Sequence, residues 1–187
     1  SKIGSKELVR VSFLNAISTV IKMFTGLISI KVIASVIGPS GIALLGQLNN
    51  FSNIRLSIST GGINAGITKY ISEHSSSENK TNLFLGTGFW ITAVFSILTG
   101  LVLIFGAGYF AEIILFDRKY TSIFYIFGGT IILYAFNTLL ISIINGFKDY
   151  NRYLIINIVG SIVGLVFSVV LALKFGIYGA LLSAVTY

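Results

Sequence analysis

Residues 8–72 read LVRVSFLNAISTVIKMFTGLISIKVIASVIGPSGIALLGQLNNFSNIRLSISTGGINAGITKYIS, and this stretch decides the fold. Two long apolar runs meet inside it at Gly38-Pro39-Ser40-Gly41. Neighbouring glycine and proline are typical of a turn, because proline presets φ and glycine tolerates unusual backbone angles. Each run exceeds the ~20 residues needed to cross a bilayer. The stretch therefore predicts a hairpin of two membrane-spanning helices.

The composition of the whole chain agrees with a membrane protein. Of its 187 residues, 55% are hydrophobic and only 10% are charged, and the mean hydropathy is +0.91. Soluble domains contain about 25% charged residues, so a soluble core could not use this much apolar sequence. Alternating segments of the outer-membrane barrel type are not found. The expected fold class is all-α, a polytopic bundle of transmembrane helices.

Residue counts exclude several kinds of site. The chain has no cysteine, so disulfides and thiolate metal sites are excluded, and its one histidine, His74, cannot hold a metal alone. No metal site is expected. Most cations flank the apolar runs, so the net charge of +7 is assigned to membrane topology rather than to nucleic-acid binding. An enzyme is the least expected class, because we find no intramembrane carboxylate pair, no nucleophile with its base and no phosphate loop.

The apolar runs predict five complete membrane spans and the start of a sixth. The second run contains Gly61, Gly62 and Gly66, which are expected to bend it. The polar residues 73–82 are expected to form a loop, and the amphipathic residues 109–117 are expected to lie at the membrane interface. The expected spans are residues 8–37, 40–72, 83–105, 121–147, 153–175 and, incomplete, 178–187.

The ends of the chain and its loops carry further expectations. The chain begins without methionine and stops inside an apolar run, so we expect a piece of a longer protein. Loop charges predict a cytoplasmic N-terminus, because seven cations lie on its side of the membrane and three on the other. The seven are Lys2, Lys6, Arg10, Lys69, Lys80, Lys148 and Arg152, and the three are Arg118, Lys119 and Lys174.

Polar residues recur every three or four positions, so each predicted helix has one polar face. The first, second and fourth faces consist of Asn15, Ser18, Lys22, Thr25 and Ser29; of Ser52, Arg55, Ser59, Gly62 and Gly66; and of Thr130, Tyr134, Asn137 and Asn145. The third and fifth consist of Thr92, Ser96 and Thr99, and of Asn157, Ser161, Gly164 and Ser168. Small and hydroxyl residues let membrane helices pack closely, and packing is the favoured interpretation for the third and fifth faces. The charges and amides of the other three predict that they converge on a hydrated cavity.

Three cations and no acid lie inside the first two runs. A charge in a bilayer costs at least ~2.5 kcal/mol on insertion scales, so it usually has a function. Lys22 lies sixteen residues before Gly38 and Arg55 sixteen after Pro39, which places both ~24 Å from the turn. Two like charges at one depth repel each other, so we expect an anion or water between them, although each could instead snorkel to the surface. Lys31 is expected on the opposite helix face from Lys22, toward a neighbouring helix or a lipid phosphate.

The sign of these charges indicates the kind of ligand. An exporter of cationic drugs would need carboxylates in its spans, and the sequence places Glu112 and Asp117 outside them. A cationic cavity suits a phosphate or pyrophosphate, which arginine can bind with two hydrogen bonds.

Four segments resemble a known family in their content and order. They are VIKMFTGLISIKVIASVIGPSGIALLGQ, GGINAGITKY, NGFKDYNRYLIINIVGSIVG and GIYGALLSAV. The chain resembles the Wzx-type flippases for undecaprenyl-pyrophosphate-linked oligosaccharides, such as O-antigen translocases, in the superfamily of multidrug and toxin extrusion pumps. The resemblance implies a bacterial inner-membrane transporter of about twelve spans in two lobes, of which residues 1–187 would form the N-terminal lobe. It also implies alternating access, in which a lipid-linked sugar enters from one leaflet and leaves from the other.

The resemblance also bears on individual residues. Lys22 and Lys31 fall where the first-span lysines of the family fall, whereas Arg55 matches no family position. Lys69 and Lys148 lie in the family-like motifs TKY and GFKD at helix ends, where they are expected to anchor topology or packing. The expected substrate-binding residues are Lys22, Arg55, Lys31, Asn15, Ser18, Thr25, Ser59, Asn137 and Asn145, and the expected hinges are Gly61, Gly62 and Gly66.

The expected function is therefore translocation of a polyprenyl-pyrophosphate-linked oligosaccharide, without a catalytic residue or a cofactor. Coupling to protons or sodium stays open, although no intramembrane acid supports it. Membrane lipids, a polysaccharide polymerase and a chain-length regulator are the expected partners. Two alternatives stay open, namely an ion-coupled drug exporter of the same fold and a non-transporting scaffold of polysaccharide assembly.

Overall fold

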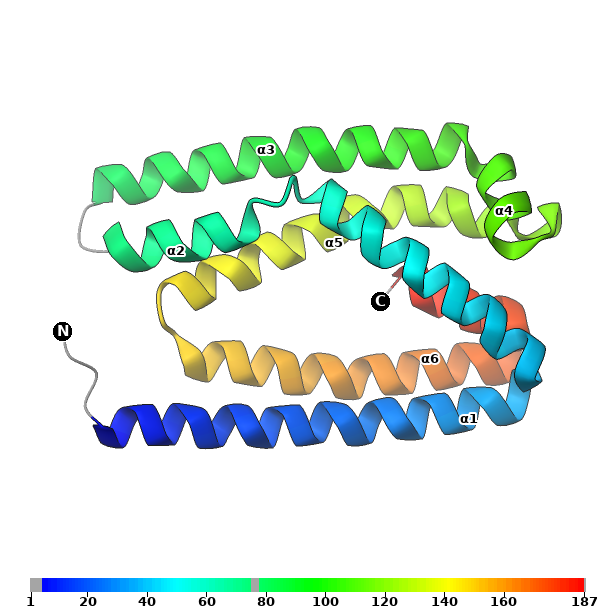
Figure 1. Ribbon diagram of the computed structural model, residues 1–187, viewed down its shortest axis with the longest axis horizontal. Helices are drawn as coiled ribbons and strands as arrows, with labels where there is room; N and C mark the ends of the chain where they lie inside the picture. The colour runs from blue at the N-terminus through cyan, green and yellow to red at the C-terminus, as the bar shows by residue number, and fades with distance from the viewer. Residues whose placement is uncertain (1–4, 75–77, 187) are drawn as a thin grey trace.

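The computed structural model describes residues 5–74 and 78–186, and every regular element in these ranges is a helix (Figure 1). Four of these helices are long and apolar enough to cross a membrane. They are α1 (Ser5–Ser59), α3 (Glu78–Phe105), α5 (Thr121–Gly146) and α6 (Tyr150–Thr186). The predicted all-α membrane bundle is thus confirmed, and the chain is a multi-pass membrane protein.

Helix α1 contains the predicted hairpin. It is interrupted at Gly38, whose φ of 70° and ψ of −178° are not helical. A residue with a Cβ rarely adopts such angles, and the following Pro39 offers no N–H to continue the hydrogen-bond ladder. In Figure 1 the blue half and the cyan half of α1 run in opposite directions from this point. The turn chemistry read from the sequence therefore reverses the chain where expected.

The second predicted helix, residues 40–72, is broken rather than bent. Helix α1 ends at Ser59, and α2 (Asn64–His74) starts after a short turn. Gly61 and Gly62 have φ of 61° and 65°, so both occupy the left-handed region that favours glycine. Gly66 lies inside α2 and takes no part in the break. Of the three glycines that were expected to bend the chain, Gly61 and Gly62 lie at the break and Gly66 does not.

Other boundaries shift because polar residues extend helices beyond the apolar runs. Helix α2 continues to His74 and α3 starts at Glu78, so most of the expected loop 73–82 is helical, and residues 75–77 lie outside the described ranges. The short helix α4 (Ala107–Leu115) and the 3-10 turn η1 (Arg118–Tyr120) occupy the expected interfacial segment. By contrast, α6 is interrupted at the non-helical Gly176 (φ 58°, ψ −133°), which lies between the expected end of the fifth run at 175 and the expected start of the sixth at 178.

The main apolar core lies among α3, α4, α5, the second half of α1 and the last residues of α6. Its fully buried members include Leu103, Ile123 and Phe124. Helices α3 and α5 approach closely at two glycines: a Cβ built on Gly100 would lie 2.6 Å from the carbonyl oxygen of Gly128. Small residues at crossing points allow such backbone contact between membrane helices.

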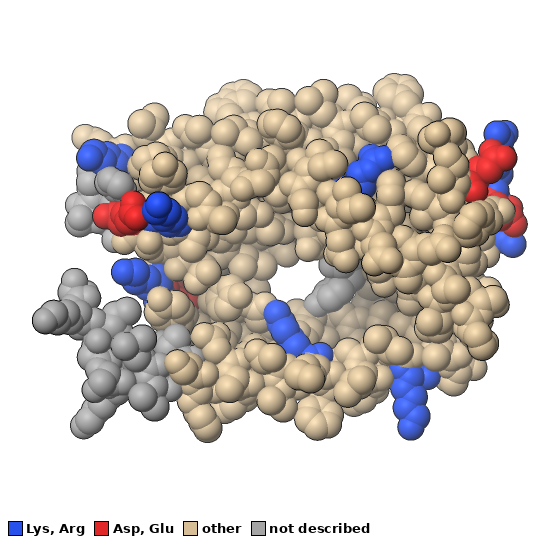
Figure 2. Space-filling model, viewed as in Figure 1, with Lys and Arg blue, Asp and Glu red and all other residues tan. Residues whose placement is uncertain are grey.

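The first half of α1 and α6 form a separate layer. Up to Gly176, α6 runs beside the first half of α1 in the same direction along the lower edge of Figure 1, and beyond Gly176 it turns back into the bundle. A small core of Ile33, Ile37, Ala172 and Ala180 joins them next to their two kinks. Figure 2 shows the molecule hollowed between this pair and the other helices, with a basic side chain at the edge of the hollow.

Candidate polar cavity around Lys22

The side chain of Lys22 crosses from α1 to α6. Its Nζ donates a hydrogen bond of 2.6 Å to Oδ1 of Asn157. The amide nitrogen of Asn157 donates in turn to the backbone oxygen of Tyr153, at 2.8 Å. That second bond orients the amide so that its oxygen faces the ammonium group. An ammonium group has three donors, and the described residues offer Lys22 Nζ no other acceptor, so two donors face the cavity.

A pocket of about 380 Å³, here called the lysine pocket, surrounds this contact. It lies among α1, α5 and α6 and is lined by Lys22, Asn137, Ile141, Ile156, Asn157, Gly160 and Ser161. Ser161 Oγ donates to the backbone oxygen of Asn157 at 2.7 Å, so its lone pairs stay available to a ligand. The lysine pocket thus offers one cation, two amides and one hydroxyl.

A second pocket of about 380 Å³, the hydroxyl pocket, continues from it along α1 and α6. The two pockets share Lys22 and Ser161. The polar residues that the hydroxyl pocket adds are Thr25, Ser29, Asn49, Ser168 and Ser183. Ser29 and Ser168 hydroxyls bond each other across the helix pair at 3.0 Å. Together the pockets form a polar track with the ammonium group between them.

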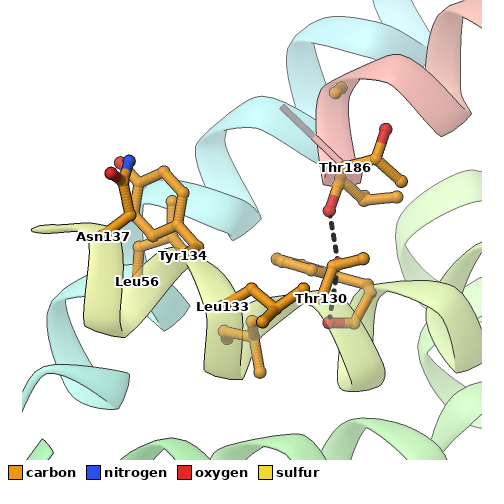
Figure 3. Close-up of a pocket in the computed structure, with 10 residues that line it drawn as sticks. Leu56, Thr130, Leu133, Tyr134, Asn137 and Thr186 are labelled. Carbon is orange, nitrogen blue, oxygen red and sulfur yellow. Dashed lines mark hydrogen bonds between the residues drawn. The ribbon is translucent and has the colours of Figure 1, made fainter. Parts of the chain in front are cut away.

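A third pocket, of about 290 Å³, opens beside the track (Figure 3). Asn137 lines both this pocket and the lysine pocket and so connects them. In Figure 3, Thr130, Tyr134 and Asn137 follow one another along one side of α5. Thr130 Oγ1 donates to the backbone oxygen of Val185 at 2.6 Å, which ties the end of α6 to α5.

The polar faces of the first and fourth predicted helices therefore meet, as expected. The fifth face, for which packing was the favoured interpretation, also belongs to the cavity through Asn157 and Ser161. An amide inside an apolar run was the signal that could have identified it. Asn49 and Ser183 were not singled out either, because neither belongs to a long polar face.

Arg55 is not brought to this cavity. Its guanidinium group lies over the rings of Phe51 and Phe110, 4.5 Å and 4.3 Å from their centroids. It lines a different pocket, against α3. Ser52 and Ser59 on the same helix are buried, so much of the second polar face packs within the bundle. The arrangement in which Lys22 and Arg55 share one anion is thus absent from this structure.

The remaining predicted site residues have varied surroundings. Thr25 lines the hydroxyl pocket, whereas Ser18 is buried and Asn15 is exposed and outside the described pockets. Lys31 is exposed, with no ion pair to the described residues. The backbone oxygen of Asn145 accepts from Lys148 N–H in the turn after α5, away from the pockets. The third face, composed of Thr92, Ser96 and Thr99, is buried, in agreement with packing.

The two polar pockets contain a positively charged side chain, Lys22, but no negatively charged one. No aspartate or glutamate lines either polar pocket. Three described acids pair at helix ends instead, namely Glu112 with Arg118, Asp117 with Lys119 and Asp149 with Arg152. Hydrogen bonds from the Lys119 side chain and backbone hold the pKa of Asp117 below its usual value. An uncompensated ammonium group in a polar pocket is suited to an anion.

The family model described as polysaccharide biosynthesis protein matches residues 8–186. The chain belongs to this family. It is 26% identical over 176 residues to the lipid III flippase of Escherichia coli (strain K12) and to that of Shigella flexneri. The match covers 94% of this chain but 42% of each relative, so the chain spans less than half the length of these flippases. No solved structure matches significantly. Membership in the polysaccharide biosynthesis family confirms the resemblance read from the four sequence segments.

Proposed function

We propose that this chain forms the N-terminal lobe of a flippase for lipid-linked oligosaccharides in the bacterial inner membrane. The proposed substrate is an undecaprenyl-pyrophosphate-linked repeat unit, such as that of O-antigen, and the N-terminus lies in the cytoplasm. Membership in the polysaccharide biosynthesis family and likeness to two lipid III flippases favour transport over catalysis. A polysaccharide polymerase and a chain-length regulator are the proposed protein partners.

The observation that carries the proposal is the environment of Lys22. Its ammonium group has two unused donors in a pocket without a carboxylate. A hydrogen bond between a charged donor and a phosphate oxygen contributes about 1.5–3 kcal/mol. The amides and hydroxyls around it can exchange hydrogen bonds with sugar hydroxyl groups. A cationic drug would meet repulsion at the same position.

The proposed mechanism is non-covalent. The phosphate accepts hydrogen bonds from the two unused donors of Lys22, the sugars occupy the polar track, and the polyprenyl chain stays in lipid. Gly61 and Gly62 absorb the backbone change as the cavity opens alternately to the two sides. The absence of carboxylates from both pockets gives no support to proton or sodium coupling within these residues.

The test uses a strain that lacks its own oligosaccharide flippase and measures polysaccharide at the cell surface. The full-length protein that contains this lobe should restore the surface polysaccharide. Lys22→Met keeps the length and removes the charge, and it should lower the signal at least ~10-fold at equal protein level. Lys31→Met is the matched control, because Lys31 is an exposed lysine of the same helix outside the pockets. Its signal should change less than ~2-fold.

Two outcomes would contradict separate parts of the proposal. Full surface polysaccharide with Lys22→Met would remove Lys22 from the substrate path while leaving transport intact. Failure of the unmodified protein to restore any signal would argue for a scaffold or a drug exporter. Dye efflux in the same strain then distinguishes these two.

A further inference from the structure

Among the described residues, Arg55 has no acceptor for its hydrogen bonds. It lies on the second half of α1, half-buried, with the Phe51 and Phe110 rings near its guanidinium carbon at 4.5 Å and 4.3 Å. Aromatic rings attract a cation through their faces, but they leave the N–H groups at the edge of the guanidinium plane unbonded. Within residues 5–74 and 78–186, no hydrogen bond or ion pair to Arg55 occurs.

The acids closest in sequence to Phe110 form ion pairs with cations other than Arg55. Glu112 bonds Arg118 Nε at 2.8 Å, and Asp117 bonds Lys119 Nζ at 2.9 Å. Both pairs are exposed at the end of the bundle where α4 lies. The guanidinium group therefore has no counter-ion from this segment of the chain.

The pocket beside Arg55, here called the arginine groove, is apolar and open. Its volume is about 460 Å³, and it is lined by Arg55, Ile58, Phe95, Leu98, Thr99 and Val102. Leu98 and Val102 are 55% and 53% exposed, so the groove opens at the surface of the helix bundle. The hydroxyl of Thr99 donates to the backbone oxygen of Phe95, which leaves Arg55 as the main polar feature. The groove shares no residue with the lysine pocket.

A cation in an apolar groove is expensive in a membrane unless an anion reaches it. The ligand must therefore combine an anionic head with hydrocarbon. A phosphate group accepts two parallel hydrogen bonds from the edge of a guanidinium plane. Helical side chains lean toward the N-terminus of their helix, which for this half of α1 is the Gly38 end. Arg55 therefore leans toward the end of the bundle where the chain reverses.

We propose that the arginine groove binds a bilayer phospholipid. Its phosphate pairs with the guanidinium edge of Arg55, and its acyl chain lies along Ile58, Leu98 and Val102. The phospholipid comes from the leaflet at the Gly38 end of the bundle. This site is separate from the lysine pocket, so it goes beyond the proposed transport function and does not depend on it.

Native mass spectrometry of the purified protein in detergent tests the proposal with three probes. Phosphatidylglycerol carries both head and chains, diacylglycerol with the same chains lacks the phosphate, and inorganic phosphate lacks the chains. Phosphatidylglycerol should bind at least ~10-fold more tightly than either of the others. Arg55→Gln should reduce its affinity at least ~10-fold. Lys174→Gln, which removes an exposed cation outside the groove, should leave the affinity within ~2-fold.

A second variant distinguishes loss of the binding site from a folding defect in Arg55→Gln. Leu98→Trp fills the groove from the exposed face of α3 while Arg55 stays in place, and it should lower phosphatidylglycerol binding by a similar factor. Unchanged binding in both variants overturns the proposal. Equal binding of diacylglycerol also overturns it, because the phosphate would then be irrelevant. Equal binding of inorganic phosphate excludes a bilayer phospholipid as the occupant, because the acyl chains would then be irrelevant.

Discussion

Two helix contacts in this molecule, α3 with α5 and α1 with α6, both include a polar helix face. The first contact is closed, whereas the second is open. In the first, Gly100 and Gly128 bring the backbones together, and Thr92 and Ser96 are fully buried. In the second, Lys22 and Asn157 bridge the helices and stand beside open pockets. Glycine at a crossing point removes the space between helices, whereas a long cation and its amide partner require it. A polar face therefore indicates packing or a cavity according to the length and charge of its members.

The closed contact should be the more sensitive to added volume. A Cβ on Gly128 would lie 2.5 Å from Ile104 Cγ1 and 2.8 Å from the oxygen of Gly100. Gly128→Ala should therefore lower the unfolding free energy by about 2–3 kcal/mol. Gly129→Ala is the matched control, because a Cβ there meets nothing within 4 Å, and it should be neutral or stabilising. Unfolding of both variants in mixed micelles measures the difference. Equal unfolding free energies would show that the two helices are not in close contact.

The open contact should be more sensitive to charge than to volume. Asn157→Asp puts a carboxylate where Oδ1 now lies 2.6 Å from Lys22 Nζ. The new ion pair competes with the substrate phosphate, so surface polysaccharide should fall about 10-fold, equivalent to about 1.4 kcal/mol, while the fold is kept. Asn151→Asp, at an exposed position of the same helix, should have little effect. Unaltered transport in Asn157→Asp would remove this contact from the substrate path.

The hydrogen bond between the Ser29 and Ser168 hydroxyls, which joins α1 and α6, should contribute little to the unfolding free energy. Hydrogen bonds between membrane helices contribute about 0.6 kcal/mol on average, so Ser29→Ala should lower the unfolding free energy by that amount. Ser35→Ala is the control, because Ser35 bonds the backbone oxygen of Val32 in its own helix. A double-mutant cycle with Ser168→Ala measures the coupling between the two hydroxyls. A coupling energy of zero would mean that the pair does not interact.

The smallest effect is expected at Asp117, in the exposed turn between α4 and η1. Asp117 accepts hydrogen bonds from Lys119 that lower its pKa. A lowered pKa in the folded state stabilises the fold above the unfolded pKa of about 3.9, and this stabilisation is lost as the pH falls through the lower folded pKa. Asp117→Asn should therefore be slightly less stable than the parent at pH 7 and equal to it in strong acid. A stability difference that persists unchanged in acid would exclude the carboxylate as its source.

The fold follows from the sequence because its signals are local. Gly38-Pro39 reverses the chain and Gly61-Gly62 breaks it, since both depend on backbone angles that few residues adopt. Helix ends are less predictable, because polar residues at a membrane surface can continue a helix as readily as end it. The start of α3 at Glu78, before its apolar run, is the example.

The site follows from the sequence only in part. Lys22 is identifiable because a lone charge in an apolar run is costly in a membrane. Its partner Asn157 lies 135 positions away, and no local pattern connects the two. The direction of Arg55 was also not predictable, because the rotation of the second half of α1 depends on how the chain turns at Gly38 and packs against α3.

The single non-helical residue at Gly38 has a consequence for biogenesis. With one glycine between the two halves of α1, the chain has no polar loop that could cross the bilayer after the first half is already in place. The backbone of each half forms its hydrogen bonds within its own helix, so both can enter the hydrocarbon together. We therefore expect the first two spans to enter the bilayer without a polar segment between them, which carries the charges of Lys22, Lys31 and Arg55 into the membrane within one continuous apolar stretch.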